Sequence, residues 1–107
     1  MSNSNSPDPI KKIIEEERAL AVVRVLHASP LMMSNDGVLQ KCVQAYGLAC
    51  GYEEFRAHLG QLEREGLISS ERHEDRVVVR LTQRGADAAQ GLIVVDAVAR
   101  PDPRGSY

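Results

Sequence analysis

A chain of 107 residues, 43% hydrophobic and 26% charged, has the size and composition of a single small globular domain. Its formal net charge of -2 excludes a strongly basic, nonspecific nucleic-acid binder, so any DNA contact must come from a local basic patch. The longest unbroken apolar run, Leu92 to Val95, is far too short to span a membrane, and no signal segment opens the sequence, so we expect a cytoplasmic protein.

The first structured element is predicted to be a helix from Asp8 to about Ala28. Residues 1–7 are rich in serine and asparagine and predict a flexible N-terminal arm. Asp8 followed by Pro9 is typical of an N-cap with proline in the first helical turn, and Ser29-Pro30 ends the helix. Its apolar residues recur near helical spacing and are expected to form one buried stripe: Ile10, Ile13, Ile14, Leu20, Val23 and Leu26.

Two short helices follow, separated by a few residues. The cluster from Ser34 to Gly37 supplies caps for the first, whose apolar side is expected to comprise Val38, Leu39, Val43 and part of Tyr46. Gly47 is a C-terminal cap for it. The next helix begins near Tyr52, carries Phe55, Leu59 and Leu62 on one side, and closes at Gly66. This pair predicts a helix-turn-helix.

A β-hairpin and a last helix complete the domain. Leu67-Ile68 opens one strand, Arg76–Leu81 forms the other with Val77, Val79 and Leu81 on one face, and His73-Glu74-Asp75 is the turn. Thr82 caps a helix containing Ala86, Ala88 and Ala89, which Gly91 interrupts. The fold class is therefore mainly α with a small antiparallel β-hairpin, a winged helix-turn-helix, over residues 8–91.

Residues 92–107 form a C-terminal extension with apolar stretches at Leu92–Val95 and Ala97–Ala99. Because exposed apolar segments are an aggregation hazard, we expect this extension to be covered. The favoured arrangement is a symmetric homodimer that uses it as a contact. The alternative is packing against the first helix of the same chain.

The segment from His58 to Gly85 resembles winged-helix transcription regulators of the ArsR and MarR type. Its sequence is HLGQLEREGLI, then a polar hairpin, then VVVRLTQRG. Gly66 matches the helix end before the wing, and Leu81-Thr82 with Gly85 matches the return into the last helix. Over nearly the whole folded segment, including Arg100-Pro101, the chain also resembles the small winged-helix proteins of Mu-like phages and prophages. These resemblances imply a phage setting and binding of duplex DNA by the third helix.

The candidate DNA-binding residues lie on the third helix and the wing: Tyr52, Arg56, Gln61, Arg64, Arg72, His73, Arg76 and Arg80. The acids of the third helix, Glu53, Glu54, Glu63 and Glu65, outnumber its arginines and would repel phosphate. Those acids motivate the alternative of a protein-interaction module with a winged-helix fold, which binds a host or phage protein and no DNA.

The sequence shows no catalytic motif, so we expect neither an enzyme nor a cofactor. Cys42 and Cys50 lack the close spacing of metal ligands, and without an export signal they are expected to be reduced thiols, Cys42 as a small core residue. The remaining question is which partner the surface binds.

Overall fold

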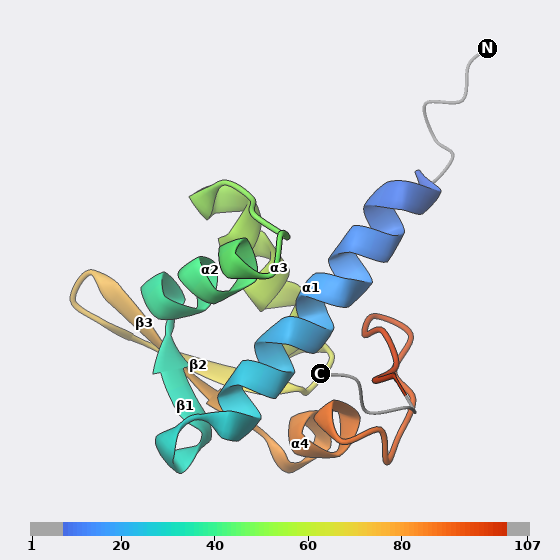
Figure 1. Cartoon of the computed structure of the whole chain (residues 1–107). Helices are drawn as coiled ribbons and strands as arrows, with labels where there is room; N and C mark the ends of the chain where they lie inside the picture. Colours follow the sequence, from blue (N-terminus) through green and yellow to red (C-terminus); the bar gives the residue numbers. More distant parts are fainter. Residues whose placement is uncertain (1–7, 103–107) are drawn as a thin grey trace.

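The computed structural model describes residues 8–102, and the predicted arm at 1–7 and the end of the chain at 103–107 lie outside the described residues. Helix α1 spans Pro9–Ala28, and a single 3-10 turn at Pro30–Met32 leads into strand β1, Met33–Asn35. Helices α2, Asp36–Ala45, and α3, Tyr52–Arg64, precede strands β2, Ile68–His73, and β3, Arg76–Leu81, and helix α4, Gln83–Ala89. Figure 1 shows this order.

The predicted helix boundaries are confirmed by their caps. The Asp8 carboxylate accepts from the backbone N–H groups of Ile10 and Lys11, and Asn35 caps α2 through the N–H of Val38. Thr82 caps α4 by accepting from the N–H of Gly85. Gly47 and Gly66 have φ of 79° and 78° after α2 and α3, the left-handed conformation that glycine adopts without a Cβ penalty.

The sheet of the described residues has three strands in the order β1-β3-β2, all antiparallel. The pairing of β2 with β3 confirms the predicted hairpin, and β1 adds a third strand that pairs with β3. Strand β1 was not predicted: Ser34 lies in it, opposite Val79, and the helix cap falls to Asn35 alone. The turn of the hairpin is Glu74-Asp75, since His73 still pairs with Arg76 as the last residue of β2.

The core lies between α1, the inner face of the sheet and the helix-turn-helix. Predicted residues at its centre are fully buried, among them Leu26, Phe55 and Val79. Gly85 is required where α4 meets the sheet, because a Cβ there would overlap the carbonyl oxygen of Leu67. The glycine of the LTQRG segment thus allows α4 to pack close to the start of β2.

Several residues expected to be buried are exposed. Ile10, Ile13 and Ile14 are 68%, 57% and 37% exposed, because the first turns of α1 extend beyond the rest of the domain (Figure 1). Val38 and Tyr46 on α2 are exposed as well, while Leu39 and Val43 carry the buried side of that helix. Cys42, expected in the core, is only half-buried, and both cysteines are free thiols.

The apolar part of the C-terminal extension packs on its own chain. Val95 and Val98 are buried in the common core, and the backbone N–H of Ala99 donates to the carbonyl of Glu16 on α1 at 3.0 Å. Leu92 and Val94 stay exposed. Packing within the chain, the alternative to a dimer contact, therefore accounts for the inward-facing residues of this segment.

Candidate nucleic-acid interface

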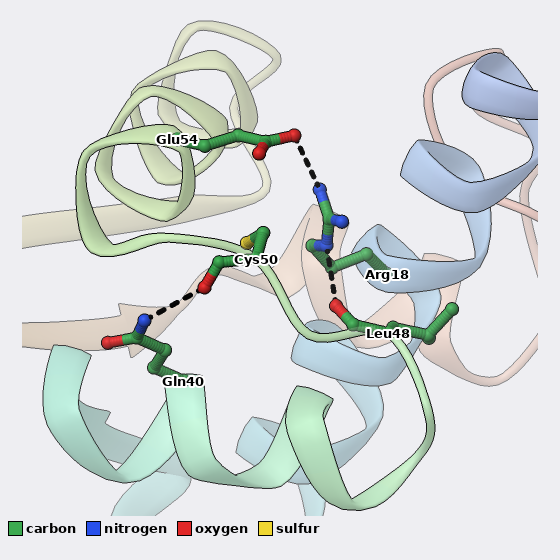
Figure 2. A network of polar contacts seen from close by, with 5 residues as sticks. All are labelled: Arg18, Gln40, Leu48, Cys50 and Glu54. Atoms are coloured by element: carbon green, nitrogen blue, oxygen red, sulfur yellow. Dashed lines mark hydrogen bonds and ion pairs between the residues drawn. The ribbon is translucent and has the colours of Figure 1, made fainter.

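The turn between α2 and α3 is held in place by polar contacts (Figure 2). Arg18 on α1 is buried, and its Nε donates to the carbonyl of Leu48 at 3.1 Å. Its Nη1 lies 3.7 Å from the carboxylate of Glu54 at the start of α3. Gln40 on α2 donates to the carbonyl of Cys50 at 3.0 Å. These contacts fix the position from which α3 leaves the turn.

A second polar centre, at Asp36, joins α2, α3 and the wing. Its side chain is 1% exposed and accepts from the N–H of Gly37, the N–H of Val77 and the hydroxyl of Tyr52, the last at 2.5 Å. Burial favours the neutral acid, but these hydrogen bonds and the charge of Arg56 outweigh it and lower the pKa of Asp36 below 3.8. The end of β3 nearest the hairpin turn and the start of α3 are therefore bound to one ionised carboxylate.

The outward side of α3 lies opposite the side chains that this helix buries in the core. Phe55, Leu59 and Leu62, with His58, form the inward side. At 100° per residue, the opposite side presents a ridge of five residues, which we call the α3 ridge: Glu53, Arg56, Ala57, Gly60 and Arg64. Arg56 and Arg64 thus flank two small residues that let another molecule approach the helix backbone closely.

Most acids of α3 point away from this ridge. Glu54 faces Arg18, Glu63 accepts from the Ser70 hydroxyl at 2.6 Å on the wing side, and Glu65 is the C-cap residue beyond the helix end. Burial, with a smaller effect of the Arg18 charge, lowers the pKa of His58 to about 4, so its ring is neutral at pH 7. The ridge itself carries two arginines and one glutamate, whereas the helix as a whole carries an acidic excess.

Two of the predicted α3 residues do not lie on the ridge. The Tyr52 hydroxyl donates to Asp36 and accepts from Arg56 Nη1 at 3.2 Å, so this side chain orients Arg56 at the edge of the ridge. The Arg56 guanidinium also lies 5.9 Å from the centre of the Tyr52 ring. Gln61 lies on another side, lining a pocket of about 260 Å³ between α3, α1 and the C-terminal segment.

The predicted wing residues divide between the two faces of the hairpin. Cross-strand partners share a face, so Arg72, opposite Val77, lies on the face that packs towards α3. His73, Arg76 and Arg80 lie on the other face, and the His73 ring is 3.5 Å from the Glu71 carboxylate. Arg76 reaches the start of α2, where its guanidinium lies against Gly37. Arg80 lies at the far end, opposite Met33 of β1.

The structure places Tyr52 and Arg56 beside Asp36, and Arg76 against the neighbouring Gly37. Arg64 is the last residue of α3, and Arg72 lies on the opposite face of the wing from Arg76. Gln61 and Arg80 lie apart from this group, in the pocket beside α1 and opposite Met33 of β1. Sequence reasoning did not single out Arg18 or Asp36. Their only signal was a charge in an otherwise apolar part of a helix and an acid at a helix start.

The order of α2, α3 and the β2–β3 hairpin defines a winged helix-turn-helix protein. The chain is similar to the uncharacterized protein gp26 of Escherichia phage Mu, with 35% identity over 95 residues, which cover 89% of this chain and 98% of that protein. The chain belongs to the family of this phage protein. No protein-family model matches the chain, and no solved structure matches it. In residues 8–102 no helix is long and apolar enough to cross a membrane.

Proposed function

We propose that this protein binds double-stranded DNA through the α3 ridge and the wing and acts as a transcriptional regulator of a phage or prophage. The observation that carries the proposal is that Arg56 and Arg64 lie on either side of two small residues on the outward side of α3. Glu54 and Glu63 are directed away from this side, towards Arg18 and Ser70. The resemblance of His58–Gly85 to ArsR- and MarR-type regulators adds support. The role needs no catalytic group and no cofactor.

In the proposed complex α3 enters the major groove, and Arg56 and Arg64 contact base edges or phosphates there. Small residues between them allow the helix to lie deep in the groove. Arg76 and Arg72 contact the DNA backbone from the two faces of the wing, and His73 lies close to the hairpin turn. Asp36 and Tyr52 do not contact DNA, and they hold the Arg56 side chain in position through hydrogen bonds.

The test is fluorescence anisotropy of the full chain with duplex DNA from its own promoter region and with random duplex, from low to moderate salt. We expect preference for the promoter duplex and an affinity that falls steeply with salt. The double variant R56A/R76A should abolish binding of the promoter duplex, and the salt slope of any residual binding should fall by about 2 because two cationic contacts are lost. The matched control R80A/R100A removes one arginine at the end of β3 farthest from the hairpin turn and one on the C-terminal segment, and it should retain most of the affinity.

Equal loss in both double variants would mean that net charge alone drives binding and would contradict the assigned residues. Absence of binding even at low salt would contradict DNA binding altogether. That result would favour the alternative, a protein-interaction module, for which the exposed Leu31, 82% accessible, and the exposed isoleucines of α1 offer contact surface.

A further inference from the structure

A pocket of about 260 Å³ lies where α1, α3 and the C-terminal segment meet, and we call it the His58 pocket. On α3, the lining residues His58, Leu62 and Glu65 are spaced i, i+4 and i+7 and so lie on one side of that helix. Glu15 lines the pocket from α1, and Asp96 lines it from the C-terminal segment. Three segments that are far apart in the sequence therefore form one concave site.

The walls of the His58 pocket are fixed by the core. Leu62 is fully buried, and Val95 and Val98, which lie on either side of the lining residues of the C-terminal segment, are buried in the same core. The backbone N–H of Ala99 donates to the carbonyl of Glu16 at 3.0 Å and holds that segment against α1. The pocket is therefore already formed without a ligand, as small-molecule sites usually are.

The buried ring of His58 lacks a hydrogen-bond partner. The residue is 8% exposed and lines the pocket, and its Nε2 is buried without a partner among residues 8–102. Burial and the charge of Arg18 lower the pKa of His58 to about 4, so the ring is neutral at pH 7 and one of its nitrogens accepts a hydrogen bond. Because buried polar atoms are normally hydrogen-bonded, an N–H or O–H group of a ligand would complete the set of contacts.

The other polar groups give the His58 pocket a negative charge. Its carboxylates are half-buried or exposed, and they are Glu15, Glu16, Glu65 and Asp96. Within the described lining Lys12 is the one cation, and its Nζ pairs with Glu16 at 2.7 Å. Four carboxylates against one ammonium group leave an excess of three negative charges. The site therefore attracts a cation and repels carboxylates and phosphates.

We propose that the His58 pocket binds a compact organic monocation, with its ammonium group among the carboxylates, its carbon skeleton against Leu62 and Ala97, and a hydrogen-bond donor directed at His58. This order of groups follows from burial, because His58 and Leu62 are buried whereas the carboxylates reach solvent. The ligand contacts the inward side of α3 and leaves the α3 ridge free. Its binding is measured without DNA, so the result is independent of the proposed function.

Tyramine is a suitable probe, because it carries a phenolic hydroxyl at one end of an aromatic ring and an ammonium group at the other. We expect a titration of the full chain, followed by NMR of the backbone amides, to shift the signals of residues 12–16, 58–65 and 96–97. The dissociation constant should be roughly 10 μM to 1 mM. Phenethylamine, which lacks the hydroxyl, should bind about three- to tenfold more weakly. Hydroxyphenylpropionate, which has a carboxylate in place of the ammonium group, should not bind.

Two variants test the assigned contacts. E65Q/D96N removes two of the carboxylates and should weaken tyramine binding about three- to tenfold. The matched control E53Q/D75N alters an exposed glutamate on the α3 ridge and an exposed aspartate in the hairpin turn, and it should leave the affinity unchanged. H58L removes the acceptor and should lower the affinity for tyramine to that for phenethylamine. A purely structural effect of H58L would weaken the binding of both amines equally.

Four results would overturn the proposal. They are no shift of these signals up to about 10 mM tyramine, shifts confined to residues outside the pocket, equal weakening by E53Q/D75N and E65Q/D96N, and equal binding of tyramine and hydroxyphenylpropionate. If H58L does not fold, as judged by circular dichroism, the comparison of tyramine with phenethylamine on the original chain decides the contact with His58. Equal affinities for these two amines would contradict it.

Discussion

Asp36 shows how one buried carboxylate can hold three elements together. With the side chain removed, the buried N–H of Val77 and the partly buried hydroxyl of Tyr52 lose their acceptor. We expect D36A to lower the free energy of unfolding by about 2–4 kcal/mol, measured by urea denaturation at pH 7. D75A, which alters an exposed acid in the hairpin turn, is the control and should change little. A D36A variant as stable as the control would show that the Asp36 carboxylate contributes nothing to the free energy of unfolding.

The pKa of Asp36 adds a pH signature to the same variant. Because the folded pKa lies below 3.8, the carboxylate stabilises the fold fully above that pH, and the stabilisation is lost as the pH falls through the folded value. The stability difference between D36A and the original chain should therefore narrow below pH 3.8. The measurement is urea denaturation at pH 7 and at pH 3.

His58 gives acid sensitivity in a higher pH range. Its pKa falls from 6.5 in the unfolded chain to about 4 in the folded one, where burial disfavours the charged ring and Arg18 adds to the effect. Between these values the unfolded state binds more protons, so the free energy of unfolding decreases as the pH is lowered, by up to about 1.4 kcal/mol per pH unit, and levels off below about pH 4.

We expect H58Q to remove this contribution, so that its free energy of unfolding falls less steeply than that of the original chain between pH 6.5 and 4. Thermal or urea denaturation across that range gives the two slopes. H73Q, at an exposed ring in the wing, serves as the histidine control. Parallel slopes for H58Q and the original chain would contradict the assignment.

At the level of elements, Arg18 ties α1 to the turn that starts α3 (Figure 2). R18M keeps much of the side-chain bulk but leaves the carbonyl of Leu48 without its donor, and we expect a loss of about 1–3 kcal/mol in urea denaturation. E54Q removes only the ion pair, whose carboxylate is 55% exposed, and should cost less than about 1 kcal/mol. If the two variants cost the same, the ion pair and not the buried hydrogen bond would be the important contact.

The elements that could be predicted from the sequence are those with local signals. Asp8-Pro9, Gly47, Gly66 and Thr82 mark helix ends by the chemistry of a few neighbouring residues, and each was placed correctly. Strand β1 has only three residues and no alternation of its own, and it exists because β3 offers an edge for pairing. Such a strand cannot be read from its own residues.

The candidate site was predicted less well, for the same reason. Asp36 meets partners 16 and 41 residues away, so its sequence neighbours indicate only a helix cap. Counting charges over α3 gave an acidic helix, yet the structure directs Glu54 and Glu63 towards α1 and β2. Periodicity also showed which side of α1 is apolar but not where the domain ends, and Ile10 therefore appeared buried.

At the scale of the whole molecule, the domain is closed by its C-terminal segment. Within residues 8–102, four α-helices and a three-stranded sheet bury one core, and residues after α4 contribute Val95 and Val98 to it. The segment lies against α1 at Glu16, so the two ends of the described chain are linked through the longest helix. This linkage makes residues 92–102 part of the fold, although the sequence pattern suggested an extension.

A chain that ends at Gly91 should therefore be less stable than one that ends at Asp102. It loses the burial of Val95 and Val98, which are 5% and 7% exposed, and the hydrogen bond from Ala99 to the Glu16 carbonyl. We expect a loss of about 3–5 kcal/mol in urea denaturation and increased hydrogen exchange in the middle of α1, which the segment covers. If the apolar residues served another copy instead, the shorter chain would unfold like the longer one and differ from it only in association.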